Sequence, residues 1–151
     1  MPCGLRPESG GSERLVAHVD SARSEVDNPW EDLVVSVLSV NNRSVESTYA
    51  HISSLRKQGL FEPKNLARWD HDTISKRLQA GGYDRGSFMT DLFAGRLANL
   101  GKHVEQVGTV ACLKAISGDD VKAIERLLLP VNGIGPAVIR NFCFLRNISG
   151  S

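Results

Sequence analysis

Apolar residues recur along this chain at the three- and four-residue spacing of amphipathic helices, and no segment alternates as a half-buried strand would. The pattern therefore predicts an all-α fold, a compact bundle of several helices. Residues 30–40 carry leucine or valine on most sides of a helix, which indicates a helix at the centre of the domain. Asn28 and Pro29 precede it as an N-cap and an N1 proline.

The other predicted helices are bounded by capping residues and glycines. Ser44 and Asp72 are the expected N-caps of the helices that follow them. A long helix is predicted over residues 83–100 and is expected to end at Gly101. Its apolar face consists of Phe88, Leu92, Phe93, Leu97 and Leu100. The remaining predicted helices cover residues 12–26, 44–57, 64–67, 72–78, 103–115 and a segment capped by Asp119 or Asp120 that ends near 129.

The length of 151 residues suits one domain, with residues 1–11 as a flexible leader and 12–151 as the helical domain. No stretch approaches the roughly 18 consecutive apolar residues of a membrane-spanning helix, and the N-terminus lacks the apolar centre of a signal peptide. We therefore expect an intracellular monomer without membrane contact, cytoplasmic and nucleoid-associated if the source is prokaryotic. The three cysteines lie far apart without C-x2-C spacing, which argues against a cysteine-built zinc or iron–sulfur site.

Charge is distributed unevenly, although the net charge is only +1. Residues 1–32 hold seven acids and three bases, net −4, whereas 33–151 hold ten acids and fifteen bases, net +5. From Arg126 to the end there are three arginines and no acid. An ordinary solvated surface explains single charges, but a basic tilt around one structural feature suits a phosphate ligand.

That feature is the segment P-V-N-G-I-G-P-A-V at residues 130–138, which joins two predicted helices through glycines spaced two apart. Pro136 suits the first position of the second helix. The amides around Gly135, Ala137 and Val138 would then begin a helix without intrahelical partners, and together with the helix dipole they predict an anion site. An isolated G-x-G between helices is more often just a tight turn, but the leucine run before it, Pro136 after it and the basic tail favour the phosphate interpretation.

A phosphodiester held by backbone amides is bound without reading sequence. Ile134 is expected to anchor the turn in the core, and Arg140 to add a charge one turn into the second helix. The residues expected to contact a DNA backbone are Asn132, Gly133, Ile134, Gly135, Pro136, Ala137, Val138 and Arg140.

This hairpin resembles that of the helix-hairpin-helix DNA glycosylase superfamily, typified by endonuclease III, which has the form L-P-G-V-G-R-K-T-A. Three further segments match in order over residues 28–150. Residues 29–41 look like the family's P-F-E-L-L…V-L-L-S-A-Q segment, and G-G-Y-D-R at 81–85 looks like its G-L-Y-N-S turn. F-C-F-L-R-N-I at 142–148 is similar to H-F-L-R-N-V of the archaeal 8-oxoguanine glycosylase branch. The family's motif then covers about 119–147.

The resemblance implies a six-helix barrel that binds kinked double-stranded DNA, damaged or abasic, with one base flipped out of the stack. By position, the duplex wedge falls on Asn41, with Asn42 and Arg43 beside it, and Tyr83 and Arg85 are further candidates for lesion recognition. Residues 41–43 fit a helix-ending cap equally well, and Tyr83 fits a core anchor. We expect no cofactor and no iron–sulfur cluster, and one monovalent cation held by hairpin carbonyls is conceivable.

Two family features are missing. Ala137 stands where bifunctional members have a lysine that attacks the sugar C1′ and forms a Schiff base. The family's catalytic aspartate follows the second hairpin helix in a V-D-x-H-like segment, about where this chain ends at Ser151. No catalytic residue is identifiable, so the domain looks truncated and the sequence leaves open whether it is an enzyme. Three functions remain: a monofunctional DNA N-glycosylase of base-excision repair, a non-catalytic DNA-binding module or incomplete fragment, and a helical protein-interaction domain.

Overall fold

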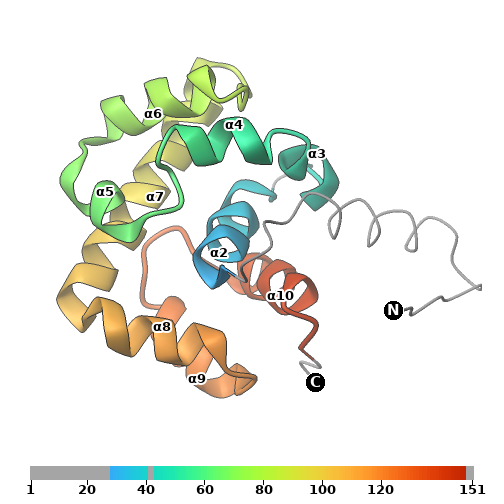
Figure 1. The fold of residues 1–151 in the computed structure, drawn as a ribbon, viewed down its shortest axis with the longest axis vertical. Helices are drawn as coiled ribbons and strands as arrows, with labels where there is room; N and C mark the ends of the chain where they lie inside the picture. The colour runs from blue at the N-terminus through green and yellow to red at the C-terminus, as the bar shows by residue number, and fades with distance from the viewer. Residues whose placement is uncertain (1–27, 41–42, 149–151) are drawn as a thin grey trace, which may run out of the picture.

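The computed structural model describes residues 28–40 and 43–148 (Figure 1). Within these ranges the chain forms helices and no strand, so the all-α bundle expected from the sequence is confirmed. The predicted leader, the predicted helix over 12–26, Asn41 and Asn42 lie outside the described residues. The helices are α2 (Pro29–Leu38), α3 (Val45–Tyr49), α4 (Ile52–Lys57), α5 (Pro63–Arg68), α6 (His71–Ala80), α7 (Ser87–Val107), α8 (Thr109–Ser117), α9 (Val121–Leu128) and α10 (Pro136–Leu145).

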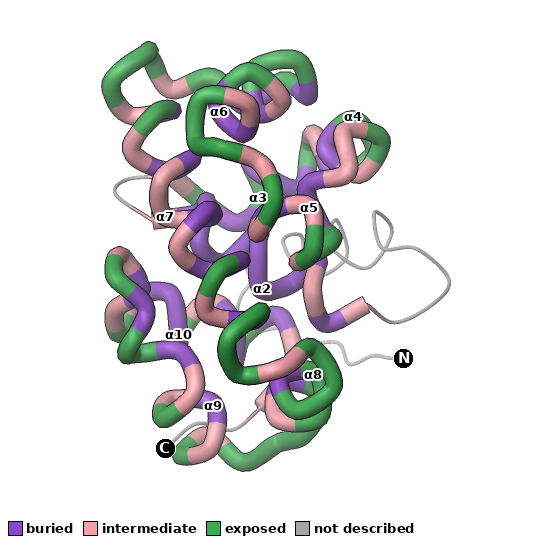
Figure 2. Tube along the Cα trace, turned by 90° about the vertical axis from the view of Figure 1, so that its left-hand side faces the viewer, coloured by how far each residue is buried: buried purple, intermediate pink, exposed green. Residues whose placement is uncertain are grey.

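The apolar helix α2 lies at the centre of the molecule, as its sequence predicts. Asn28 caps it, because its side chain accepts a hydrogen bond from the Trp30 amide at 3.1 Å, and Pro29 takes the N1 position. Apart from the half-buried Trp30, every residue of α2 is buried (Figure 2). The helix packs against α3, α7, α8 and α10, so it connects the two halves of the bundle.

Helix α7 is longer than the sequence predicts, because Gly101 does not end it. A Cβ at Gly101 would lie 2.5 Å from backbone atoms of Leu66 and Ala67 in α5, so the missing side chain lets two helices pack closely. The helix ends instead at Gly108, which has φ +108°. The predicted boundary between the helices over 83–100 and 103–115 was therefore wrong. It lies at Gly108, and the helix that follows it is α8.

Two other predicted helices differ from the structure through local caps and packing. Ser44 does cap a helix, but the segment divides at Ala50 and His51 into α3 and α4. The imidazole of His51 packs where a side chain at Gly82 would stand, with Nδ1 only 2.6 Å from the position of a Cβ, so this break is coupled to the turn after α6. Helix α6 begins at His71 because Asp70, rather than Asp72, is its N-cap.

Most of the apolar face predicted for the long helix is buried, including Phe93, Leu97 and Leu100. Leu92 is only partly buried, and Phe88, in the first turn of α7, is 78% exposed. Cys112 and Cys143 are buried free thiols, and burial raises the pKa of both. Among the described helices, none has the length and apolar character needed to cross a membrane.

Candidate nucleic-acid interface

Helices α9 and α10 are joined by the glycine-containing turn at residues 129–135, which we call the hairpin turn. Its backbone is closed by two short hydrogen bonds, from the Val131 amide to the Leu128 carbonyl at 3.0 Å and from the Ile134 amide to the Val131 carbonyl at 3.1 Å. The Ile134 side chain is 5% exposed and belongs to the core cluster. The prediction that Ile134 anchors the turn is therefore confirmed.

The hairpin turn is docked on α7, a contact that the sequence did not indicate. The Asn99 side-chain amide donates to the Asn132 carbonyl at 3.1 Å, and His103 Nε2 lies 2.7 Å from the Leu127 carbonyl. Gly133 has φ +102°, and a Cβ there would lie 2.5 Å from Cγ of Arg96. Glycine is thus required at 133 both by its backbone conformation and by the close approach of α7.

The second glycine of the hairpin turn is under neither constraint. Gly135 is the N-cap of α10 with φ −125° and ψ −169°, an extended conformation that any residue adopts. A Cβ at Gly135 would meet nothing within 4 Å. The space beside this part of the turn is therefore open to a ligand.

The amides at the start of α10 are only partly satisfied. Pro136 has no N–H, and the Val138 amide donates to the Gly135 carbonyl at 3.1 Å, so the expectation that Val138 is an open donor was wrong. The first turn tightens enough to form this bond to the residue three positions back. None of the hydrogen bonds among residues 28–40 and 43–148 uses the amides of Gly135 and Ala137. These two donors stand at the positive end of the helix dipole.

The electrostatic setting of these amides suits an anion. No Asp or Glu occurs from Arg126 to the end of the sequence, so no carboxylate of α10 opposes the helix dipole. Arg140 is exposed one turn beyond Pro136. The site combines two open amides, one exposed guanidinium and a rigid support on α7, which are the components of a phosphate site.

The residues predicted as a wedge or lesion contact are placed differently from the hairpin. Asn41 and Asn42 lie outside the described residues. Tyr83 is fully buried, and its hydroxyl donates to the Leu38 carbonyl at 2.9 Å. This placement favours the core-anchor interpretation of Tyr83 over stacking on a base. Burial raises the pKa of its phenol.

The two arginines of that group are anchored around Tyr83. Arg43 donates from Nε to the Thr48 hydroxyl at 3.0 Å and from Nη2 to the Ser47 carbonyl at 3.1 Å, and its guanidinium lies 4.6 Å from the Tyr83 ring centroid. Arg85 donates from Nη1 to the Val40 carbonyl at 2.8 Å. The structure therefore brings these residues together beside the end of α2.

Arg96 connects this group to the hairpin, and sequence reasoning missed it. Its guanidinium lies 4.8 Å from the ring centroid of Phe93, while Arg85 approaches the same ring at 5.2 Å. Phe93 in turn meets Tyr83 edge to face, with centroids 6.4 Å apart. We call Arg43, Arg85 and Arg96 the arginine cluster. Arg96 belongs to no motif in the sequence, so nothing marked it in advance as a functional residue.

The C-terminal end of α2 is held by side chains from distant segments. Asn141 of α10 donates to the carbonyls of Ser39 and Ser36 at 2.8 and 3.3 Å. Tyr83 and Arg85 donate hydrogen bonds to two further carbonyls of this segment, those of Leu38 and Val40. The chain before residue 41 is thus fixed to both the hairpin helix and the arginine cluster.

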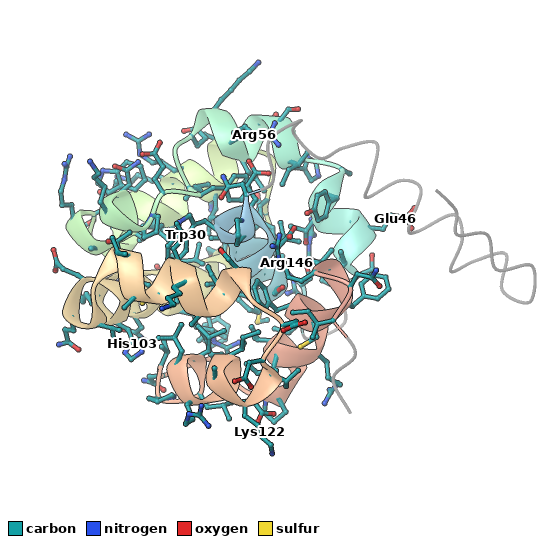
Figure 3. The ribbon with its side chains drawn as sticks, turned by 60° about the horizontal axis from the view of Figure 1, so that its bottom comes forward. Trp30, Glu46, Arg56, His103, Lys122 and Arg146 are labelled. Carbon is teal, nitrogen blue, oxygen red and sulfur yellow. The ribbon has the colours of Figure 1, made fainter. Side chains whose placement is uncertain are left out.

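The buried carboxylates belong to structural ion pairs. Asp32 accepts from Arg146 at 3.1 Å and from the Tyr49 hydroxyl at 2.7 Å, which joins α2 to the end of α10 (Figure 3). Glu31 pairs with Arg56 at 2.7 Å. Both carboxylates are held by guanidinium groups, an arrangement that satisfies a buried charge rather than freeing it for acid–base work.

A cation site is not defined by the side chains. No group of three or more His, Cys, Asp or Glu side chains suited to a metal occurs in the described part of the chain. In the hairpin turn, the carbonyls of Val131 and Asn132 already accept hydrogen bonds. Each carbonyl has a second lone pair, so a monovalent cation at the hairpin stays a prediction.

Comparison with known proteins adds no relative: no protein-family model, curated protein or solved structure matches this chain. The structure therefore defines a compact all-helical protein whose α9–α10 turn presents open amides.

Proposed function

We propose that this protein binds the phosphodiester backbone of duplex DNA at the hairpin turn, as a DNA-binding domain of the base-excision glycosylase type. The observation that carries the proposal is the open start of α10, where the amides of Gly135 and Ala137 have no acceptor among the described residues. A phosphate oxygen accepts from such amides and is favoured by the dipole of the helix.

Two features favour a DNA backbone over a free anion. The hairpin turn is held rigidly by Asn99 and by the contact of Gly133 with Arg96, so its amides are oriented before a ligand arrives. The ordered resemblance to the helix-hairpin-helix glycosylases, over residues 29–41, 81–85 and 130–148, supports duplex DNA as the source of the phosphate. Binding of this kind depends on the backbone and is independent of base sequence.

The test uses the open space at Gly135. In Gly135→Asp the new carboxylate accepts from the amides of Ala137 or Val138, which caps α10 and places a negative charge in the phosphate position. We expect affinity for a fluorescent duplex to fall roughly 10- to 100-fold, since hydrogen bonds to a charged group contribute about 1.5–3 kcal/mol. The unfolding free energy should rise by about a few tenths of a kcal/mol because aspartate is a good N-cap.

Gly118→Asp is the matched control. It makes the same change in charge just before the N-terminus of α9, at the end of that helix opposite to the hairpin turn. Gly118 is also extended, with φ −90° and ψ −172°, and a Cβ there would make only ordinary contacts at 3.8 Å. Fluorescence anisotropy with plain and abasic duplexes compares the variants. Equal affinities for Gly135→Asp, Gly118→Asp and the unaltered protein would contradict the proposal, and binding of a protein partner without DNA affinity would favour an interaction domain instead.

A second candidate function is release of a damaged or mismatched base, favoured by the same ordered motifs. With Ala137 in place of the family's lysine, such an activity would be monofunctional and would leave the abasic strand intact. A panel of duplexes that carry different lesions tests it. Base release without strand cleavage is the expected result, and no release from any lesion would contradict catalysis by this chain.

A further inference from the structure

The arginine cluster is a second concentration of positive charge next to the hairpin turn. Three guanidinium groups gather on the buried pair Tyr83 and Phe93, at centroid distances of 4.6, 5.2 and 4.8 Å for Arg43, Arg85 and Arg96. They come from three separate segments: the chain before α3, the turn before α7, and α7 itself. We propose that Arg43 and Arg96 of this cluster bind a second phosphate of the DNA strand held at the hairpin turn, an inference that rests on the proposed function.

The first argument is electrostatic. Like charges held together disfavour one another unless an anion compensates them. Burial lowers the pKa of the Arg43 guanidinium, and the charge of Arg85 contributes to the same effect. None of the ion pairs in the described ranges includes Arg43 or Arg96. The adjacent carboxylate, Asp84, already accepts from the Gly86 amide at 3.0 Å.

The second argument concerns the donors that remain. Arg43 uses Nε and Nη2 for the protein and has Nη1 left, and the guanidinium of Arg96 donates no hydrogen bond within the part of the chain that the structure describes. Both side chains are half-buried. Contact with the rings of Tyr83 and Phe93 therefore holds both guanidinium groups in place in advance. Arg96 can then bind a phosphate through two parallel N–H groups, and Arg43 through Nη1.

The third argument identifies the ligand as phosphate rather than a base. The rings of Tyr83 and Phe93 are fully buried, so they offer no free face on which a base could stack. The cluster also continues the hairpin site, since Arg96 Cγ occupies the space beside Gly133. We therefore assign to the cluster a phosphate that neighbours the one at the amides of α10.

The salt dependence of duplex binding tests this second contact. Removing one phosphate contact lowers the slope of log K against log salt by about 0.9. We expect this decrease for Arg96→Gln, which loses the charge and keeps the Cγ beside Gly133. Arg96→Lys should keep the slope, because its charge and stem remain. Lys122→Gln removes a charge from the first turn of α9, at the edge of the molecule, and should leave the slope unchanged (Figure 3).

The results separate the two proposals. If Gly135→Asp weakens DNA binding but Arg96→Gln has the slope of the unaltered protein, the second site is refuted and the hairpin site stands. A titration with sodium tripolyphosphate, followed by calorimetry, probes the cluster without DNA. Heat that is lost in the Arg43→Gln/Arg96→Gln double variant and retained in Gly135→Asp supports the cluster even if the duplex does not bind, and absence of any such heat together with an unchanged slope overturns it.

Discussion

Helices α2 and α10 both have ten residues and begin with proline at N1, yet their N-termini are completed differently. In α2 the Asn28 side chain accepts from the Trp30 amide, and two acids, Glu31 and Asp32, occupy the first turn. In α10 the N-cap is Gly135, which has no side chain, and the first turn contains no acid. One helix start is satisfied within the protein, whereas the other leaves its donors and its dipole to an external acceptor.

The two N1 prolines differ in burial in the same way as the two helix starts differ in capping. Pro29 is buried, and the start of α2 lies inside the bundle, where an open amide would carry a large desolvation cost. Pro136 is exposed, and the start of α10 faces open space. An uncapped helix start is tolerated at this exposed position because solvent can satisfy its donors.

The largest expected effect on stability comes from breaking the ion pair in the first turn of α2. Arg146→Met leaves the carboxylate of Asp32 buried without its guanidinium, and loss of one partner of a buried pair costs about 3–5 kcal/mol. Urea denaturation measures the loss. Adding Asp32→Asn to the variant should recover part of this loss, because the buried negative charge is removed. A change below about 1 kcal/mol would show that the pair is already hydrated.

Substitution of the two glycines of the hairpin turn should have smaller and unequal effects on the unfolding free energy. Gly133→Val forces a branched residue into φ +102° and against Arg96, which should cost about 2–3 kcal/mol and displace the turn from α7. Gly135→Val fits the extended backbone and the open space, so its cost should stay within about 1 kcal/mol, the usual cost of a poor N-cap. Thermal unfolding of the two variants distinguishes them, and similar melting temperatures would contradict the assigned difference.

The hairpin itself was predictable because its signals are local. Pro136 and the spacing of Gly133 and Gly135 identify a turn and a helix start within a few residues, and Ile134 stands out as apolar between them. Even there, prediction failed for the Val138 amide, because whether the first turn tightens depends on the actual backbone. The bundle was predictable for the same reason, since helical spacing is read from each segment alone.

Contacts between distant segments explain what could not be predicted. Gly101 has the appearance of a helix stop, but it lies inside α7, where the absence of a side chain lets residues 66 and 67 of α5 pack closely. Arg96 and Asn99 support the hairpin turn from α7, and neither belongs to a motif. Tyr83 was open to two interpretations until the Leu38 carbonyl and the Phe93 ring were placed around it.

Removing the cap of α2 should affect stability but not DNA binding, the reverse of adding a cap to α10. In Asn28→Ala the Trp30 amide loses its acceptor in a part-buried position, which should cost about 1 kcal/mol. Denaturation and duplex anisotropy are measured on the same preparation. Affinity that falls together with stability would mean that the two helix starts are coupled through the bundle and do not act independently.

The substitution Ala137→Lys should have the smallest effect on stability, and it gives a chemical test of whether DNA lies at the start of α10. Ala137 is half-exposed at the second position of α10, and lysine there should change the unfolding free energy by only about a few tenths of a kcal/mol. If the hairpin turn holds an abasic duplex, the new amine lies beside the sugar aldehyde. It condenses with the C1′ carbonyl, loses water, and gives an imine that borohydride reduces to a stable amine.

Denaturing gel electrophoresis detects this protein–DNA adduct. Ala123→Lys is the matched control, since Ala123 is also half-exposed in the first turn of its helix, but in α9 and away from the hairpin turn. Adduct above the background of the unaltered protein is expected for Ala137→Lys alone. Equal trapping by both variants would mean that the amines react by collision, and trapping by neither, with binding intact, would place the sugar away from the start of α10.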